Sequence, residues 1–328
     1  MRNWLQRVIV STMMVIIVNA YADAALVHQK NVQLFIRDLV QRDHFDHQQL
    51  QRILAAAKYQ PQIIASMERP FEKKNWDVDQ ALFLTQERLQ SGLNFWRNNH
   101  ATLQKVEQEY GVPPEMIVAI LGVETLYGKH QGTYRVLDAL STLAFYYPPR
   151  AEYFKRELRE FLLLCREHGV SATAYKGSYA GAMGKPQFMP SSYRTYAVNY
   201  QGLGRPNLMN HDADVIVSVA NYFKKHGWKS HQMVAEKVRP PLKNAHRFDF
   251  NAKTPNYTFT QLLQAGIQPQ MPSKAYPKEV GLLELITEAG PEYWMAYPNF
   301  YVITRYNSSP QYALAVYLLA QSLRESHT

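Results

Sequence analysis

Hydrophobic residues recur three and four positions apart along most of the chain, which is the spacing of one face of an α-helix. The pattern begins near residue 32 and continues to about residue 109. Further helices are expected after it, over residues 113–128, 150–168, 214–226 and 311–323. The spacing therefore predicts a mainly α-helical protein.

The sequence after Trp228 is richer in proline and in short strand-like runs. Strands are expected there over residues 233–238, 257–262 and 300–304. The fold class is therefore mainly α, with a small β-rich subdomain in an α+β arrangement. We divide the chain into a leader over residues 1–22, a helical domain over 23–109, a helical core over 110–228 and the β-rich subdomain over 229–307. The closing helix in 308–328 is expected to pack with the helical domain.

Residues 1–22 have the three parts of a secretion signal. Arg2 and Arg7 supply the basic end, residues 8–18 are apolar, and Ala20–Ala22 forms a small-residue cleavage site. The apolar run of about eleven residues is shorter than the roughly 20 that span a membrane. We therefore expect a cleaved leader and a periplasmic protein, with an uncleaved anchor as the alternative. Because no cysteine lies near the cleavage site, a lipoprotein is not expected.

The composition favours a globular protein with an anionic partner. The chain is 46% hydrophobic, and its net charge is +9 with a pI of about 9.4. Export and the scattering of the basic residues argue against nucleic acid, which leaves cell-wall polymer, acidic phospholipid or a merely solvated basic surface. Cys165 is the one cysteine of the sequence, so an internal disulfide is excluded.

Glu124 is the strongest candidate for chemistry. It shares one helical stripe with four apolar residues, which are Ile117, Ile120, Leu121 and Tyr127. A carboxyl group on such a face loses hydration, so its pKa rises and it can stay protonated near neutral pH, as a glycosidase acid must. The alternative is a structural carboxylate neutralised by a buried arginine or by backbone donors.

Five short stretches of the chain have the order and spacing of motifs in a known family. They are Gly122–Thr125, Tyr147–Phe154, Ala180–Gly184 with Gln187–Ser192, Val219–Phe223 and Ile303–Asn307. Together they resemble the lytic murein transglycosylase B family, from about residue 70 to the C-terminus. The resemblance implies a lysozyme-like helical core and an enzyme that cleaves the β-1,4 bond between N-acetylmuramic acid and N-acetylglucosamine in peptidoglycan.

The same resemblance implies that Glu124 is the single acid and base. Glu124 would protonate the leaving oxygen and then take the proton of the muramoyl C6 hydroxyl, giving a 1,6-anhydro product. Ser178 and Gln187 would line the sugar site, and Arg150 would bind the acidic lactyl or peptide part of the muramoyl unit. The cleft would be completed by Tyr222, Tyr306, Asn307 and Tyr312.

The resemblance also bears on metal binding. Residues 199–205 are similar to an EF-hand-like calcium loop of some relatives, but Leu203 stands at an acidic ligand position and only Asp214 remains as a carboxylate. That charge is too low for tight calcium binding. We therefore expect no structural calcium and no cofactor.

Two other functions stay open at this point. One is a hydrolytic muramidase, in which a second carboxylate directs water to C1, although Asp138, Glu152 and Glu157 are interpreted as surface or capping groups. The other is a cell-wall-binding protein without turnover. In each case the expected partner is the glycan strand of peptidoglycan, other cell-wall enzymes are candidate partners, and a monomer is expected.

Overall fold

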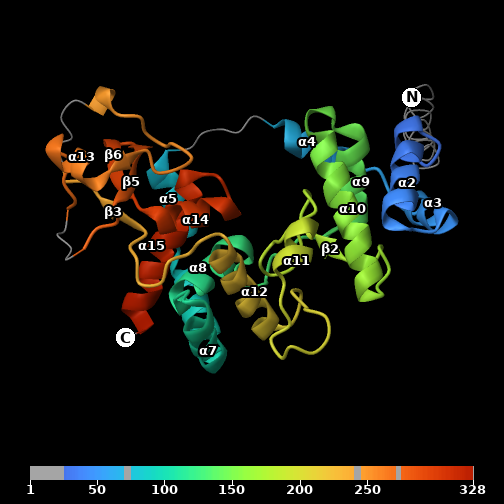
Figure 1. The fold of residues 1–328 in the computed structure, drawn as a ribbon, viewed down its shortest axis with the longest axis horizontal. Helices are drawn as coiled ribbons and strands as arrows, with labels where there is room; N and C mark the ends of the chain where they lie inside the picture. The colour runs from blue at the N-terminus through green and yellow to red at the C-terminus, as the bar shows by residue number, and fades with distance from the viewer. Residues whose placement is uncertain (1–25, 70–74, 240–244, 271–274, 328) are drawn as a thin grey trace, which may run out of the picture. The chain divides into compact units, whose positions relative to one another are not determined.

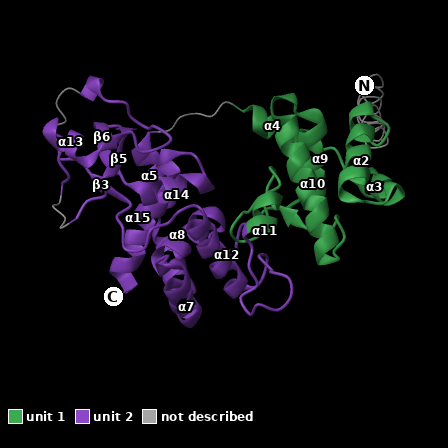
Figure 2. Ribbon diagram, in the orientation of Figure 1, with its two compact units in different colours: residues 1–70, 131–195 green, residues 71–130, 196–328 purple. Residues whose placement is uncertain are grey.

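The computed structural model describes residues 26–69, 75–239, 245–270 and 275–327. Contacts within the chain form two compact units, which Figure 2 colours separately. The first unit comprises residues 1–70 and 131–195, and the second comprises residues 71–130 and 196–328. The predicted leader over residues 1–22 lies outside the described residues.

The first unit is built around two long helices. α9 (Val136–Tyr146) is buried along most of its length, and α10 (Ala151–His168) packs along it. Two short antiparallel strands, β1 (Tyr134–Arg135) and β2 (Lys176–Gly177), flank this pair in sequence. The remaining elements are α2 (Lys30–Asp43), α3 (His47–Ala55), α4 (Pro61–Glu68), the 3-10 turn η1 (Pro148–Arg150) and α11 (Pro190–Tyr196).

The helices of the second unit gather around α8 (Pro114–Thr125), as Figure 1 shows. The neighbours that contact α8 are α6 (Gln86–Asn98), α7 (His100–Tyr110), α12 (Asp212–Lys225) and α15 (Pro310–His327). α15 also contacts α5 (Trp76–Phe83) and α14 (Pro298–Tyr306). The closing helix therefore ties together segments that lie far apart in sequence.

The second unit also carries an antiparallel sheet with the strand order β3-β6-β5-β4. Its central hairpin pairs Gly281 with Ala296 and closes at Thr287 and Gly290. Apolar side chains of the sheet and of α13 (Phe259–Gln264) form its core. The strands are β3 (Ala235–Lys237), β4 (Tyr257–Thr258), β5 (Glu279–Thr287) and β6 (Gly290–Ala296), and the 3-10 turn η2 covers Ala245–Arg247.

The structure corrects two of the three predicted strands. Residues 300–304 were expected as a strand because they are aromatic and β-branched, but they lie in α14, where Pro298 begins the helix and the residues 299–303 are buried. In 257–262 only the first two residues form a strand, because Thr258 and Gln261 form a capping box that begins α13. The strand expected over 233–238 is confirmed at its centre, where β3 covers residues 235–237.

The contact-based units cross the domain boundaries predicted at residues 109, 228 and 307, which stay predictions. α15 does contact α5 and α6 of the predicted N-terminal domain, whereas α2, α3 and α4 belong to the first unit. Among the described residues, no helix combines the length and the apolar character needed to cross a membrane.

Candidate active site

α8 places Glu124 in its last turn. The helix has proline at its start, and the residues from Met116 to Gly122 are all buried, so α8 is covered on every side and not along a single stripe. It ends at Thr125, because Leu126 and Tyr127 turn into the left-handed region with φ of 49° and 59°. Tyr127 therefore lies beyond the helix, and its predicted place on the stripe of Glu124 is wrong.

Two glycines let Tyr127 and α15 approach α8. A Cβ at Gly122 would collide with the Tyr127 hydroxyl and lie 3.2 Å from Leu319 Cδ2 of α15. A Cβ at Gly92 of α6 would meet the same hydroxyl, which donates a hydrogen bond to the backbone carbonyl of Arg88 at 3.1 Å. The close approach fixes α15 against α8, and α15 carries the partner of Glu124.

That partner is Tyr312, in the first turn of α15. Its hydroxyl donates a short hydrogen bond to Glu124 Oε1. Burial raises the pKa of Glu124 to about 7, and the hydrogen bond from Tyr312 lowers it by a smaller amount. About half of the Glu124 carboxyl groups are thus protonated at pH 7, and Glu124 keeps part of its surface open to solvent. Glu124 is therefore a candidate acid.

A cluster of aromatic rings surrounds this pair. Burial and the Glu124 charge raise the pKa of Tyr306 well above its ordinary value. The Tyr306 ring lies 4.9 Å from that of Tyr222, centroid to centroid, and Tyr222 in turn contacts His226 at 4.2 Å. The Tyr222 hydroxyl donates to the carbonyl oxygen of Arg305 at 2.6 Å. Tyr222 therefore supports the backbone beside Tyr306, a role that its predicted place in the sugar site did not include.

The structure thus brings Tyr222, Tyr306 and Tyr312 together with Glu124 in the second unit. Asn307 follows Tyr306, is exposed, and accepts a hydrogen bond from the Ser309 N–H through its Oδ1 at 3.1 Å. His226 was not singled out in the sequence. Its Nε2 is buried without a hydrogen-bond partner among the described residues, and only its spacing of four from Tyr222 could have indicated its place.

The other predicted site residues belong to the first unit. Ser178 Oγ accepts hydrogen bonds from the backbone N–H groups of Ala180 and Ala182 at 3.3 and 3.0 Å. Gln187 has φ of 51°, and its amide donates to the carbonyl oxygens of Gln131 and Gly184 at 3.1 and 2.9 Å. These bonds give a defined shape to the loop that contains Gly177, Gly181 and Gly184.

Arg150 is also in the first unit and is exposed at the start of α10. Its guanidinium lies 4.5 Å from the centroid of the Tyr153 ring. The structure describes each unit by itself, so the roles of Ser178, Gln187 and Arg150 beside Glu124 stay predictions.

The carboxylates considered as a second catalytic group are held by structural partners. Asp138 accepts two hydrogen bonds from the Arg135 guanidinium at 2.7 and 2.8 Å. Glu157 is buried and accepts from the backbone N–H and the hydroxyl of Ser191 at 3.0 and 2.7 Å. Glu152 is exposed and pairs with a lysine one turn along α10. All three belong to the first unit.

Asp214 organises the loop that was compared with a calcium site. Its two carboxylate oxygens accept from the backbone N–H groups of Tyr200 and Asn207, each at 2.8 Å. His211 Nδ1 lies 2.9 Å from the same carboxylate, and the Leu203 side chain is 79% exposed. Among the described residues, no group of three or more His, Cys, Asp or Glu side chains is placed to hold a metal. These residues do not fit a calcium site, and the absence of structural calcium stays an expectation.

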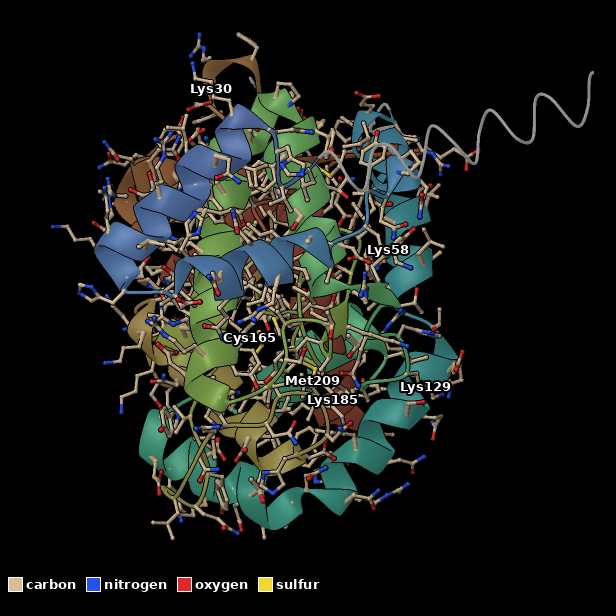
Figure 3. The ribbon with its side chains drawn as sticks, turned by 90° about the vertical axis from the view of Figure 1, so that its right-hand side faces the viewer. Lys30, Lys58, Lys129, Cys165, Lys185 and Met209 are labelled. Atoms are coloured by element: carbon tan, nitrogen blue, oxygen red, sulfur yellow. The ribbon has the colours of Figure 1, made fainter. Side chains whose placement is uncertain are left out.

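Cys165 is buried in α10, where Figure 3 labels it among the helices. Burial raises the pKa of its thiol to about 12. A thiol that stays protonated is a poor nucleophile, so a packing role fits Cys165.

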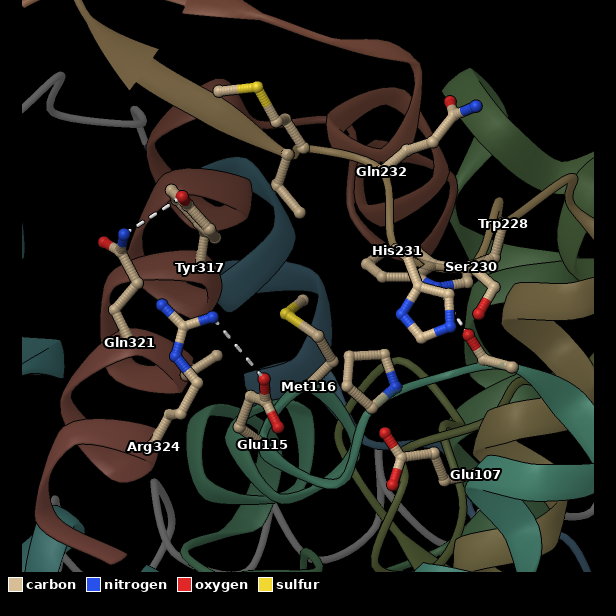
Figure 4. A pocket seen from close by; sticks show the side chains of 15 residues that line it. Glu107, Glu115, Met116, Trp228, Ser230, His231, Gln232, Tyr317, Gln321 and Arg324 are labelled. Carbon is tan, nitrogen blue, oxygen red and sulfur yellow. Dashed lines mark hydrogen bonds and ion pairs between the residues drawn. The ribbon is translucent and has the colours of Figure 1, made fainter. Parts of the chain in front are cut away.

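A separate cavity of about 380 Å³ lies at the opposite end of α8. Figure 4 shows Arg324 reaching toward Glu115, with N and O atoms 3.9 Å apart, and Gln321 donating to the Tyr317 hydroxyl. Glu115 is nine positions before Glu124, about 14 Å along the helix axis. These polar side chains of the cavity contact one another, and the cavity is lined by none of the tyrosines around Glu124.

Comparison with known proteins decides the family. The model of the transglycosylase SLT domain matches residues 28–321. The chain belongs to the family of SLT-domain transglycosylases. This lytic transglycosylase is 44% identical over 306 residues to membrane-bound lytic murein transglycosylase B of Escherichia coli (strain K12), covering 89% of this chain and 82% of the relative. The resemblance stated from the motifs is confirmed.

Solved structures of relatives confirm the lysozyme-like, mainly helical fold class. SltB1 from Pseudomonas aeruginosa, a catenated lytic transglycosylase, superposes with a TM-score of 0.86 at 40% identity, over 92% of this chain and 99% of that one. SltB3 from the same organism, in complex with NAG-NAM-pentapeptide, gives 0.81 at 29% identity, over 92% and 81% of the two chains. The protein is a peptidoglycan lytic transglycosylase, as the sequence motifs indicated.

Proposed function

We propose that this enzyme cleaves the β-1,4 bond between N-acetylmuramic acid and N-acetylglucosamine with Glu124 as its single acid and base, and that it releases a 1,6-anhydromuramoyl product. The observation that supports this proposal most is the pKa of Glu124, which burial raises to about 7. The side chain nevertheless keeps part of its surface open to solvent. A carboxyl group with that pKa can give up and regain a proton at neutral pH, which a residue that acts first as acid and then as base must do.

In the first step the Glu124 carboxyl gives its proton to the glycosidic oxygen. The bond from that oxygen to the muramoyl C1 breaks, and its electron pair leaves with the oxygen of the N-acetylglucosamine. In the second step the Glu124 carboxylate takes the proton of the muramoyl C6 hydroxyl, whose oxygen bonds to C1. Glu124 is then protonated again, no water is consumed, and the product carries an internal 1,6-ether.

The surroundings of Glu124 support a mechanism with one carboxylate. Only burial and the Tyr312 hydroxyl shift the pKa of Glu124, and no other carboxylate among the described residues of the second unit contributes. A hydrolase that uses two carboxylates places them about 5 to 10 Å apart, where each would change the pKa of the other. The Tyr312 hydroxyl can hold the carboxylate after the first proton transfer. The neighbouring rings of Tyr306 and Tyr222 offer apolar faces to a sugar.

The substrate follows from the relatives. SltB3 is solved with NAG-NAM-pentapeptide, so a glycan with a peptide on its muramoyl unit is the ligand that we assign to this chain as well. We place the enzyme in the cell envelope, as an exported periplasmic protein, because its substrate is there. Ser178, Gln187 and Arg150 of the first unit are the residues that we assign to the glycan and its acidic substituent.

The proposal is tested by replacing Glu124 with glutamine, which keeps the shape and the hydrogen-bond acceptor but cannot transfer a proton. E124Q should lose at least about a hundredfold in kcat on purified peptidoglycan and still bind the glycan. The matched control is E115Q, on the same helix and also partly buried, which should keep wild-type activity. If E124Q releases fragments at the wild-type rate, Glu124 is not the acid.

A further inference from the structure

A second cavity in the second unit lies between β5 and the connection from α14 to α15. Its volume is about 580 Å³, within the range of sites that bind small ligands. Leu283, Leu285 and Phe300 contribute apolar surface, and Asn75, Thr304 and Gln311 contribute polar groups. It shares no lining residue with the cavity at the start of α8.

The cavity adjoins the catalytic acid through one short piece of chain. Arg305, Ser308 and Gln311 line it, while the alternating neighbours Tyr306 and Tyr312 surround Glu124. The two sites therefore share residues 304–312 as a common wall.

The charge of the cavity favours an anion. Lys253 and Arg305 line it, and within the described part of the chain neither side chain forms an ion pair. The one carboxylate in the lining, Glu284, already accepts a hydrogen bond from the Tyr293 hydroxyl at 3.1 Å. The lining therefore carries two positive charges and one negative charge, and a ligand with free carboxylates would complement the excess positive charge.

The edge of β5 that faces away from β6 is occupied up to Glu284 and is open at Ile286. β4 pairs with this strand only at Glu279 and Val280, and further along Asn251 takes its place, accepting from the Glu284 N–H at 3.3 Å and donating to the Glu284 carbonyl at 3.0 Å. Because backbone groups alternate along a strand, Ile286 is the next residue that presents its N–H and C=O to this edge.

We propose that this cavity binds the acidic peptide carried by the muramoyl unit of the glycan. The peptide lies extended along β5, with the carboxylates beyond the one assigned to Arg150 at Lys253 and Arg305, small apolar side chains against Leu283 and Leu285, and its backbone at Ile286. The backbone contact at Ile286 is strand addition limited to one residue, so the two cations and the apolar side chains supply most of the specificity. The inference rests on the proposed function, since the peptide must arrive on the sugar held at Glu124.

The test compares two substrates and two charge reversals. Glycan strands that carry their peptides and strands from which an amidase has removed them are each cleaved by the wild type, by K253E and by K278E. Lys278 is an exposed lysine of the same β-rich region that does not line the cavity, so K278E is the matched control. K253E should lower kcat/KM on the peptide-bearing glycan about fivefold, the size of one exposed charge interaction, and leave cleavage of the stripped glycan unchanged.

A second measurement tests peptide binding directly, without any cleavage of the glycan. The sugar-free peptide is titrated calorimetrically into the wild type, K253Q and K278E, and K253Q alone should weaken binding several-fold. Equal losses by K253E on both glycans, or unchanged peptide binding by K253Q, would overturn the peptide site. Failure of the proposed function looks different, because the wild type would then form no anhydro ends on either glycan.

Discussion

The raised pKa of Glu124 predicts that the enzyme becomes more stable when glutamine replaces this proposed catalytic acid, and that this gain depends on pH. In the unfolded chain Glu124 ionises at its ordinary value of 4.5, whereas in the folded protein burial holds its pKa near 7. Between these values the unfolded chain has lost a proton that the folded protein keeps. The unfolded state binds fewer protons there, so the free energy of unfolding falls as the pH rises.

The magnitude follows from the two pKa values. A difference of 7 minus 4.5 corresponds to about 3 kcal/mol of stability, present at pH 4 and lost by pH 8. Glutamine at position 124 does not ionise and can still accept the hydrogen bond from Tyr312. The stability of E124Q relative to wild type should therefore be about 3 kcal/mol greater at pH 8 than at pH 4.

Urea unfolding followed by tryptophan fluorescence measures this difference in the right part of the molecule. The tryptophans beyond the leader all lie in the second unit with Glu124, and they are Trp76, Trp96, Trp228 and Trp294. Other titrating groups cancel when E124Q and wild type are compared at each pH. The control E152Q removes a carboxylate that is 79% exposed and should show no such dependence. A difference between E124Q and wild type that stays constant from pH 4 to pH 8 would refute the reasoning.

Two further substitutions test one contact at Glu124 and one contact within the first unit. Y312F removes the hydroxyl that lowers the pKa of Glu124, so the alkaline limb of the pH–rate profile should move to higher pH while kcat falls about tenfold. A limb that does not move would contradict this hydrogen bond. E157A leaves the Ser191 N–H and hydroxyl without their acceptor and should cost about 2 kcal/mol in urea unfolding followed by circular dichroism, whereas E152Q should cost almost nothing.

The sequence predicted Glu124 because its signal is local. Apolar residues three and four positions away identify Glu124 as a charged residue on an apolar helix, and the helix is present as expected. The contact with Tyr312 joins positions 188 residues apart, so spacing could not show it, and only the family resemblance suggested this tyrosine. The resemblance named Tyr222 as well, but its hydroxyl supports the Arg305 backbone, a tertiary contact that the motifs do not contain.

The strands were harder to predict than the helices. The residues Val280–Leu283 of β5 are all buried, so this strand lacks the alternation of a half-exposed strand, and its apolar run is ambiguous in sequence. In contrast, residues 300–304 have the composition of a strand but form a helix, because packing in α14 outweighs a weak local preference. The division into two units depends on contacts between distant segments, such as those of α15 with α5 and α8.

The products of cleavage test the central claim most directly. Purified peptidoglycan is incubated with the mature enzyme, and the released fragments are weighed by mass spectrometry. Intramolecular attack by the C6 hydroxyl predicts muramoyl ends that are lighter than reducing ends by about one water, absent with E124Q and present with E115Q. Reducing muramoyl ends would contradict the account, because they would show that water, directed by a second group, attacks C1.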